Sequence, residues 1–363
     1  MGIPVGVVGV SGLVGGELLR LLAGHPEFTV EHVSASGERA REPGVPLGRL
    51  HPHLSVAHTL GRLPLRDADL GEIANRCATV FLATPPEVSV RLAPELLARG
   101  VELVVDASPA FRLRGREAHD RWYPGVERPA GELAESVYGL PELNRDRIPG
   151  ARLIAVPGCF ATAALLALAP LAGIGDTFES IVIDAKSGSS GSGNRLRVSG
   201  THAMRANAVT PYAPVRHRHV AEIREVLLGR GLSTADGGLR LGMSTFGVDL
   251  VRGLSVAAHV AVRPPMAEVN LSAVVRRFYR GEPFVRIRDW KREAHPVPDP
   301  KVVAGSNFCD LAAFTDQESG RFVLLAALDN LVKGAAGQAV QCANLRHGVT
   351  EDAGLTALPL FPA

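Results

Sequence analysis

The first 150 residues alternate short apolar runs with amphipathic stretches. Buried strands of a parallel sheet give continuous apolar runs, and the helices that connect them give the amphipathic stretches. The pattern predicts strands at Ile3–Val8, Val30–Val33, Thr79–Ala83 and Leu103–Asp106, and helices over Gly15–Leu22 and Val88–Ala98. This part of the chain is therefore expected to be an α/β domain built on a parallel sheet.

The pattern changes near Arg152. It predicts a strand at Leu153–Ala155, a helix over Phe160–Leu171, a strand at Ser180–Asp184, and alternating strands near Arg240–Thr245, Gly253–Val262 and Arg321–Leu328. Such alternation is typical of a mainly antiparallel sheet with one solvated face. A helix rich in small residues, Gly334–Leu345, ends the pattern, so we expect the second domain to be inserted into the first.

Composition narrows the class of protein. The chain has 363 residues, of which 46% are hydrophobic, and a formal net charge of +2; we expect two globular domains and no nucleic-acid partner. Four widely spaced cysteines suit a reducing cytoplasm. The longest apolar stretch, Phe160–Ile174, is interrupted by Pro170 and is too short to span a bilayer, so we expect no membrane association.

A glycine-rich segment follows the first predicted strand. It places a tight turn and a helix start where a dinucleotide's pyrophosphate binds in this type of fold. The candidate cofactor residues are Gly9, Val10, Ser11, Gly12 and Leu13. Glycines also serve ordinary strand–helix turns, but the context favours a nicotinamide cofactor.

The end of the second strand indicates which cofactor. NAD sites place a carboxylate there, whereas this chain has Ser34, Ala35 and Ser36, with Arg39 close behind. Hydroxyl and guanidinium groups suit the 2′-phosphate of NADP. A polar surface loop, with Glu38 as an opposing charge, is the alternative; we expect NADP.

Cys159 is the most informative single residue. The preceding Pro157-Gly158 ends a strand and places the cysteine at the start of an apolar helix. The helix dipole favours the thiolate form at that position, which suits a nucleophile. Cys77 and Cys342 are expected to be core residues, and Cys309 is assigned no role.

Two histidines are candidates for proton transfer. If the Arg216–His219 segment is extended, His217 and His219 face the same side. Histidine can both accept and donate a proton near neutral pH. Zinc binding with a cysteine is an alternative, as is a solvated basic stripe, but a hydride-transfer pocket needs no metal.

The polar run Lys186–Arg195 is either a flexible loop or an anion site. Its hydroxyl and backbone N–H groups can surround an oxyanion, and arginines can add charge. The candidate substrate-binding residues are Ser187, Gly188, Ser190, Arg195 and Arg112.

Together these motifs resemble the N-acetyl-γ-glutamyl-phosphate reductase family, which includes the aminoadipyl-phosphate reductases of the amino-group-carrier route to lysine. The matching segments, spread over nearly the whole chain, are GVSGLVGGELLRLL, DASPAFRL, VYGLPELNR, VPGCFATAALLAL, DAKSGSSGSGNR, HRHVAEI, GSNFCD and DNLVKGAAGQAVQ. The resemblance implies a Rossmann-type NADP-binding domain of residues 1–155 plus 332–363. An inserted α+β catalytic and dimerisation domain would span residues 156–331.

The resemblance also implies roles. Cys159 would be the nucleophile, His219 or else His217 the acid/base, and Asn330 the residue at the nicotinamide end. Departures from the acetylglutamyl pattern at Val156, Phe160 and Ala161 leave the substrate open. It is either free N-acetyl-γ-glutamyl phosphate or a glutamyl or aminoadipyl phosphate on a small acidic carrier protein.

The expected function is NADPH-dependent reduction of that acyl phosphate to a semialdehyde through a Cys159 thioester, in a homodimer or homotetramer. Two alternatives remain. One is another Cys-dependent semialdehyde dehydrogenase, such as one acting on aspartyl phosphate. The other is a non-catalytic NADP-binding sensor.

Overall fold

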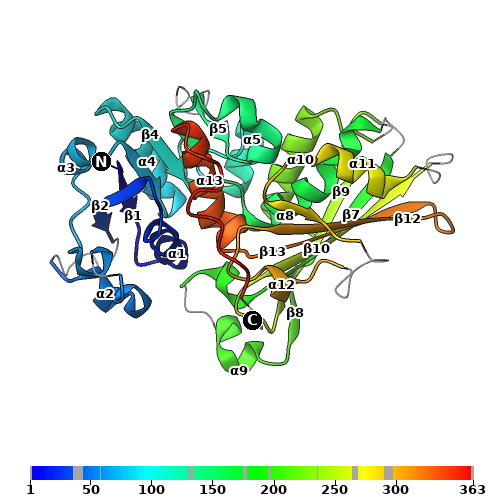
Figure 1. Ribbon diagram of the computed structural model, residues 1–363. Coiled ribbons are helices and arrows are strands. Elements are labelled where there is room, and N and C mark those ends of the chain that lie inside the picture. Colours follow the sequence, from blue (N-terminus) through cyan, green and yellow to red (C-terminus); the bar gives the residue numbers. More distant parts are fainter. Residues whose placement is uncertain are drawn as a thin grey trace. The chain divides into compact units, whose positions relative to one another are not determined.

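We describe a computed structural model of the chain. It describes residues 2–35, 44–57, 59–129, 131, 135–174, 178–194, 198–234, 236–263, 269–289 and 297–360. The chain divides into two compact units. The first comprises Met1–Pro157 with Ala335–Thr356, and the second comprises Gly158–Gly334 with Ala357–Ala363 (Figure 1).

The first unit contains a parallel sheet. In spatial order its strands are β2 (Phe28–Ser34), β1 (Ile3–Val8), β3 (Thr79–Leu82), β4 (Leu103–Asp106), β6 (Leu153–Ala155) and β5 (Val137–Tyr138). From β1 the chain runs to β2 on one side and then through β3 and β4 on the other, as in the Rossmann arrangement, and β5 lies at the edge beyond β6. The predicted α/β fold with a parallel sheet is confirmed.

Helices pack on this sheet because their apolar stripes bury against the strands. The helices of the first unit are α1 (Leu13–Leu22), α2 (Leu47–Leu50), α3 (Leu70–Arg76), α4 (Pro86–Ala98), α5 (Arg116–Trp122), α7 (Pro141–Asn144) and α13 (Gly337–Arg346). Helix α1 packs beside α13, and α3 packs beside α4. One core cluster joins α3 and α4 to β1, β3 and β4 through fully buried side chains such as Ile73, Leu96 and Val80.

The second unit contains a mixed sheet. Its strands in order are β11 (Val285–Ile287), β12 (Cys309–Asp316), β13 (Arg321–Leu328), β10 (Leu254–Val262), β7 (Phe178–Ser187), β9 (Leu241–Val248) and β8 (Val209–Ala213). Strands β7 and β9 pair in parallel, as do β11 and β12, and the other neighbours are antiparallel. The expected mainly antiparallel α+β sheet is confirmed, with these parallel pairs as its exceptions.

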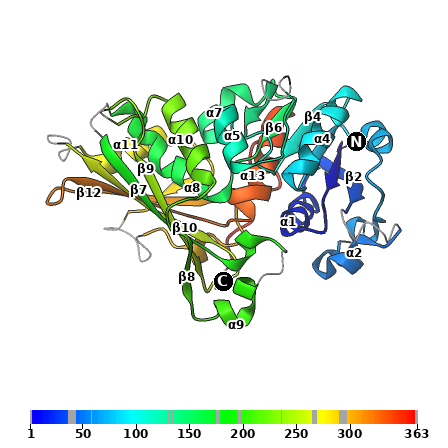
Figure 2. The same ribbon diagram turned by 180° about the vertical axis from the view of Figure 1, so that it is seen from behind.

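The helices of the second unit cover part of that sheet. They are α8 (Cys159–Leu168), α9 (His202–Arg205), α10 (His219–Gly229), α11 (Leu271–Phe278) and α12 (Pro300–Val303). Helix α8 lies against β10 and β13, with α10 beside it (Figures 1 and 2). Apart from its first residue, α8 is buried on all sides, which explains why its sequence is apolar without a polar stripe.

A short π-helix, Val332–Ala336, precedes α13. Of the residues described, none belongs to a helix long and apolar enough to cross a bilayer.

Candidate active site

The turn after β1 depends on glycine at two positions. Gly9 has φ +95°, and a Cβ atom there would lie 2.5 Å from the carbonyl oxygen of Ala83. A Cβ atom on Gly15 would lie 2.4 Å from the carbonyl oxygen of Gly9. The turn therefore folds back tightly on the first turn of α1, and the backbone N–H groups of Gly9 and Val10 tie it to the carbonyl oxygen of Ser34.

This turn fits a dinucleotide. Gly12 is the N-cap of α1 and offers no side-chain cap, so the first-turn N–H groups of the helix have no capping side chain there. A Cβ atom on Gly12 would make an ordinary van der Waals contact, 3.6 Å from the carbonyl oxygen of Gly9, so the backbone there is not crowded. Such a helix start can bind a pyrophosphate.

The end of β2 carries a second feature suited to the cofactor. Ser34 is fully buried, and its Oγ has no hydrogen-bond partner among the described residues. An orphaned hydroxyl at this strand end fits a ligand oxygen. Ala35 beside it is also buried, while the other two predicted residues, Ser36 and Arg39, lie outside the described part of the chain.

In the second unit, Cys159 is the first residue of α8, as its Pro-Gly context predicts. Its side chain is partly exposed, in contrast to the buried Cys77, Cys309 and Cys342. Burial raises the pKa of the Cys77 thiol to about 12, which excludes it as a nucleophile near neutral pH. The backbone also makes room for Cys159, because a Cβ atom on Gly334 would lie 2.7 Å from the Cβ of Cys159.

His219 lies directly beside the backbone of the residue that precedes Cys159. It is the first residue of α10 and is 4% exposed. A Cβ atom on Gly158, the residue before Cys159, would lie 2.2 Å from the Nε2 atom of His219. Only glycine leaves space for the ring at that position.

His217 contacts His219 edge to face, with ring centroids 4.7 Å apart, and both rings lie near Phe160. The Nδ1 atom of His217 accepts a hydrogen bond from the backbone N–H of His219. Burial, with a smaller contribution from Arg218, lowers the pKa of His217 to about 4. His217 is therefore neutral at physiological pH.

The Arg216–His219 segment does not meet the condition of an extended backbone, because Arg218 is a helical N-cap and α10 begins at His219. The two rings contact each other because His217 lies just before the N-terminus of α10 and His219 is its first residue. The start of this helix was not predicted because Arg216–His219 are polar and basic, and the apolar positions of the helix begin only at Val220.

Sequence reasoning missed Glu222 as a site residue. It lies one turn after His219 on α10, is 2% exposed, and its Oε1 accepts a 2.9 Å hydrogen bond from the N–H of Gly158. The contact joins the N-terminus of α8 to α10. No local sequence signal predicts a bond between residues 64 positions apart.

The serine-rich run is partly regular structure. Strand β7 continues to Ser187, and the N–H groups of Gly188, Ser189 and Ser190 donate to carbonyl oxygens of residues 250–253. Gly191 and Gly193 donate within the run. These backbone N–H groups already donate hydrogen bonds within the protein. An anion bound here would therefore contact side chains rather than these N–H groups. Arg195 lies outside the described residues.

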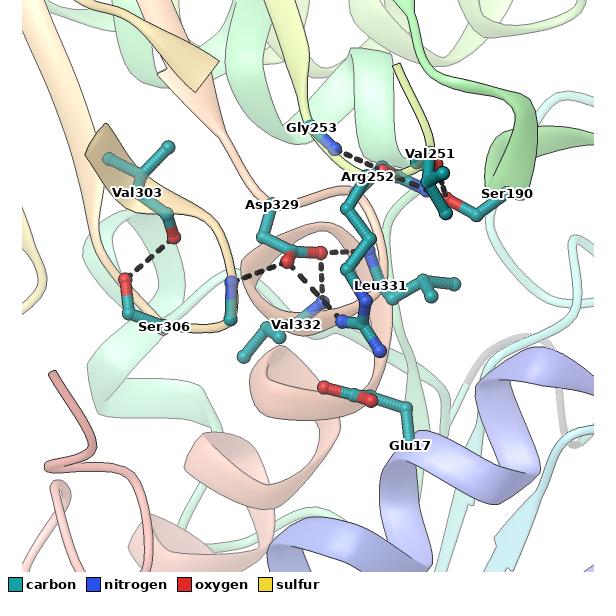
Figure 3. A network of polar contacts seen from close by, with 12 residues as sticks. Glu17, Ser190, Val251, Arg252, Gly253, Val303, Ser306, Asp329, Leu331 and Val332 are labelled. Atoms are coloured by element: carbon teal, nitrogen blue, oxygen red, sulfur yellow. Dashed lines mark hydrogen bonds and ion pairs between the residues drawn. The ribbon is translucent and has the colours of Figure 1, made fainter. Parts of the chain in front are cut away.

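Asn330 holds this run in place. Its Oδ1 accepts from the N–H of Gly253 at 2.8 Å, and its Nδ2 donates to the Oγ of Ser190 at 2.9 Å. Ser190 in turn donates to the carbonyl oxygen of Val251 (Figure 3).

The neighbouring Asp329 is fully buried and accepts from the N–H groups of Leu331 and Val332 and from Arg252 (Figure 3). It also accepts from the N–H of Gly305. Residues 329–330 thus fix the loops of the second unit that carry Ser190 and Arg252.

Arg112 belongs to the first unit and is 9% exposed. Its Nε donates to the carbonyl oxygen of Val156 at 2.6 Å, and its Nη2 donates to that of Ala107 at 2.8 Å. These bonds fix the end of β6, next to the segment that leads to Cys159. Within the described ranges, no group of three or more histidine, cysteine or acidic residues is placed to hold a metal ion.

Comparison with known proteins gives two matches to family models. Residues 4–151 match the semialdehyde dehydrogenase NAD binding domain, and residues 159–330 match the semialdehyde dehydrogenase dimerisation domain.

Curated relatives match over the full length. A putative LysW-L-2-aminoadipate/LysW-L-glutamate phosphate reductase of Nitrosopumilus maritimus is 40% identical, with 99% of each chain covered. The corresponding reductase of Saccharolobus solfataricus is 39% identical, with the same coverage. An N-acetyl-gamma-glutamyl-phosphate reductase of Synechococcus elongatus is also 39% identical, over 99% of this chain and 98% of the relative.

Solved structures with the same fold include aspartate semialdehyde dehydrogenases. The NADP complex from Candida albicans superposes with a TM-score of 0.71 at 14% identity, covering 96% of this chain and all of that one. The Vibrio cholerae enzyme gives 0.68 at 18% identity, covering 95% and 98%.

Proposed function

The chain belongs to the N-acetyl-γ-glutamyl-phosphate reductase family, which includes the LysW-linked reductases, and from this membership we propose that it reduces an acyl phosphate to a semialdehyde with NADPH. The acyl phosphate is that of an N-acylated amino acid, in arginine- or lysine-type biosynthesis. The observation that carries the proposal is the placement of Cys159 at the start of α8, with His219 against the preceding glycine.

The first step is covalent. The Cys159 thiol gives its proton to Nε2 of His219, and the thiolate sulfur attacks the acyl carbon. A C–S bond forms as the C–O bond to phosphate breaks, and the proton on His219 passes to the departing phosphate oxygen. The product is a Cys159 thioester, which is far more electrophilic than a carboxylate.

NADPH, when bound, supplies the hydride that reduces this thioester. The residues that would hold it are Gly9–Leu13 and Ser34–Ala35, together with Ser36 and Arg39. Cys159 then leaves as thiolate from the reduced carbon, which releases the semialdehyde. His219, which gave its first proton to phosphate, takes a second proton from solvent and passes it to the sulfur. The net reaction consumes one proton and releases inorganic phosphate.

The neighbours of His219 have supporting roles. His217 is neutral at physiological pH and accepts the backbone N–H of His219, so it orients that residue rather than donating a proton. Asn330 and Ser190 hold the segment after β7 in place through their mutual hydrogen bond. Ser187, Arg112 and Arg195 are proposed to act on the substrate's anionic groups. Gly188, expected from the sequence to do the same, has no side chain and its N–H donates to the carbonyl oxygen of Gly253, so it is left out.

The preferred substrate is linked to a carrier protein. Beside His217 the chain exposes Arg216 and Arg218, with the apolar side chains of Tyr212 and Val215 (52% and 80% exposed) next to them. A small acidic protein that presents an acyl phosphate on its tail fits such a surface.

The assembly is proposed to be a homodimer or homotetramer through the second unit. There β7 exposes Val182 (52%), and the matched family model describes residues 159–330 as a dimerisation domain. All four cysteines are thiols, and a thiol nucleophile works in reducing surroundings, which supports a cytoplasmic location.

A reverse-direction assay tests the proposed reaction. With phosphate and NADP, the enzyme should oxidise a carrier-linked glutamate or aminoadipate semialdehyde, and free N-acetylglutamate semialdehyde more slowly. Aspartate semialdehyde should be inert. Efficient oxidation of aspartate semialdehyde would contradict the proposal in favour of the aspartyl-phosphate alternative, and no oxidation of any semialdehyde would favour a sensor.

A further inference from the structure

A histidine outside the glycine-rich segment holds the turn of that segment. His51 lies between α2 and the short 3₁₀ helix Pro52–Leu54, as the C-cap of the first and the N-cap of the second. Its Nε2 lies 2.6 Å from the carbonyl oxygen of Val10, the second residue of the turn between β1 and α1. A carbonyl oxygen only accepts, so Nε2 of His51 carries the proton.

The second glycine of the Gly15-Gly16 pair provides the space for this ring. A Cβ atom on Gly16 would lie 2.8 Å from Cε1 of His51. Gly15 has a different task, since its missing Cβ lets the carbonyl of Gly9 approach. Gly15 therefore leaves space for the backbone of the turn, and Gly16 leaves space for the imidazole of His51.

The hydrogen bond fixes the orientation of a peptide plane. In a trans peptide the C=O and N–H groups point in opposite directions. Holding the Val10 oxygen therefore fixes the direction of the Ser11 N–H, in the turn that precedes the N-terminus of α1. A preorganised turn binds a pyrophosphate more tightly than one that must be ordered on binding.

We propose that His51 is a positioning residue for the cofactor turn, and that it acts through Val10 without touching the cofactor. The inference rests on the NADPH-binding part of the proposed function. Because one hydrogen bond to the turn is lost, His51→Ala should weaken NADPH binding about tenfold. Gly16→Ala should have a similar effect with the histidine still present, because the new methyl group displaces the ring.

The test measures NADPH binding directly, by calorimetric titration of the protein without substrate, so it does not depend on identifying the acyl phosphate. His51→Gln should restore most of the affinity, since its side-chain amide N–H reaches a position similar to that of Nε2. His53→Ala is the matched control. His53 is exposed, its ring centroid is 5.5 Å from that of His51, and no described hydrogen bond joins it to the turn.

Thermal unfolding of the cofactor-free variants separates positioning from folding. A lower melting temperature for His51→Ala with an unchanged dissociation constant for NADPH would overturn the proposal, as would equal binding by His51→Ala and His53→Ala. Normal NADPH binding by the wild type without turnover of any acyl phosphate would contradict the proposed reaction and leave this inference intact. No NADPH binding by the wild type would overturn both.

Discussion

The backbone N–H of Gly158 donates a 2.9 Å hydrogen bond to the Oε1 of Glu222. Gly158 precedes Cys159 and is the N-cap of α8, while Glu222 lies one turn after His219 on α10. This bond joins the two helix starts that carry Cys159 and His219. The bond is therefore expected to hold the sulfur of Cys159 and the imidazole of His219 in fixed positions relative to each other.

Replacement of Glu222 tests that role. Glu222→Ala leaves a buried N–H without its acceptor, a change worth about 1–3 kcal/mol, and should lower kcat by about 10- to 100-fold. Glu222→Gln keeps an acceptor oxygen and should recover most of the rate. Steady-state kinetics and the rate of Cys159 alkylation measure the effect. Equal losses in both variants would show that the charge matters, rather than the hydrogen bond.

Stability should depend on pH through His32. Its ring is fully buried, with both nitrogens lacking partners among the described residues, and burial lowers its pKa to about 4. The surrounding charges act in opposite directions: Glu72 and Asp69 raise the pKa, and Arg66 and Arg76 lower it. Between pH 6.5 and 4 the unfolded state binds the proton and the folded state does not.

The free energy of unfolding should therefore fall as the pH is lowered through that window, by about 2–3 kcal/mol from His32. His32→Leu should remove this part of the pH dependence in urea unfolding at pH 7 and pH 4.5. The exposed His53→Leu should leave it unchanged. Identical pH dependence in wild type and His32→Leu would contradict the prediction.

Cofactor preference follows from the end of β2. Without a carboxylate there, and with Ser34, Ser36 and Arg39 present, kcat/KM should favour NADPH over NADH on the order of a hundredfold. Ser34→Asp should reverse much of this preference by repelling the 2′-phosphate. Equal kcat/KM values for both cofactors in the wild type would exclude these residues as determinants.

Carrier docking should depend on salt. Steered association of an acidic protein loses rate as charges are screened, so kcat/KM for a carrier-linked substrate should fall about tenfold between low salt and ~0.3 M. Arg216→Glu should lower the low-salt value, whereas Arg277→Glu on exposed α11 should not. If acetylglutamyl phosphate is turned over efficiently with weak salt dependence and an acidic carrier does not compete, the substrate is the free acetylated one.

Short-range patterns predicted much of the fold. The strands Ile3–Val8, Leu103–Asp106 and Leu153–Ala155 have the predicted bounds because buried parallel strands leave continuous apolar runs. Cys159 starts a helix as expected, because Pro157-Gly158 interrupts the backbone pattern. Strands such as β8, whose side chains are mostly exposed, carry no such signal and were missed.

The site was predictable only where chemistry is local. Cys159 and the histidines stand out by residue type, but their arrangement depends on tertiary contacts. The bonds from Glu222 to Gly158, from Asn330 to Ser190 and from Arg112 to Val156 each join residues more than 40 positions apart. Low complexity indicated a flexible loop at residues 186–195, whereas strand pairing extends to Ser187 and the next amides bond to residues 250–253.

The proposed reaction passes through an acyl-enzyme on Cys159. Rapid mixing of the protein with the acyl phosphate in the absence of NADPH tests it most directly, with released phosphate as the signal. The wild type should release a burst of about one phosphate per subunit, and Cys159→Ser should release none while binding NADPH almost as tightly as the wild type. No burst from the wild type, or a Cys159→Ser variant that keeps even a tenth of the wild-type kcat, would contradict the covalent mechanism.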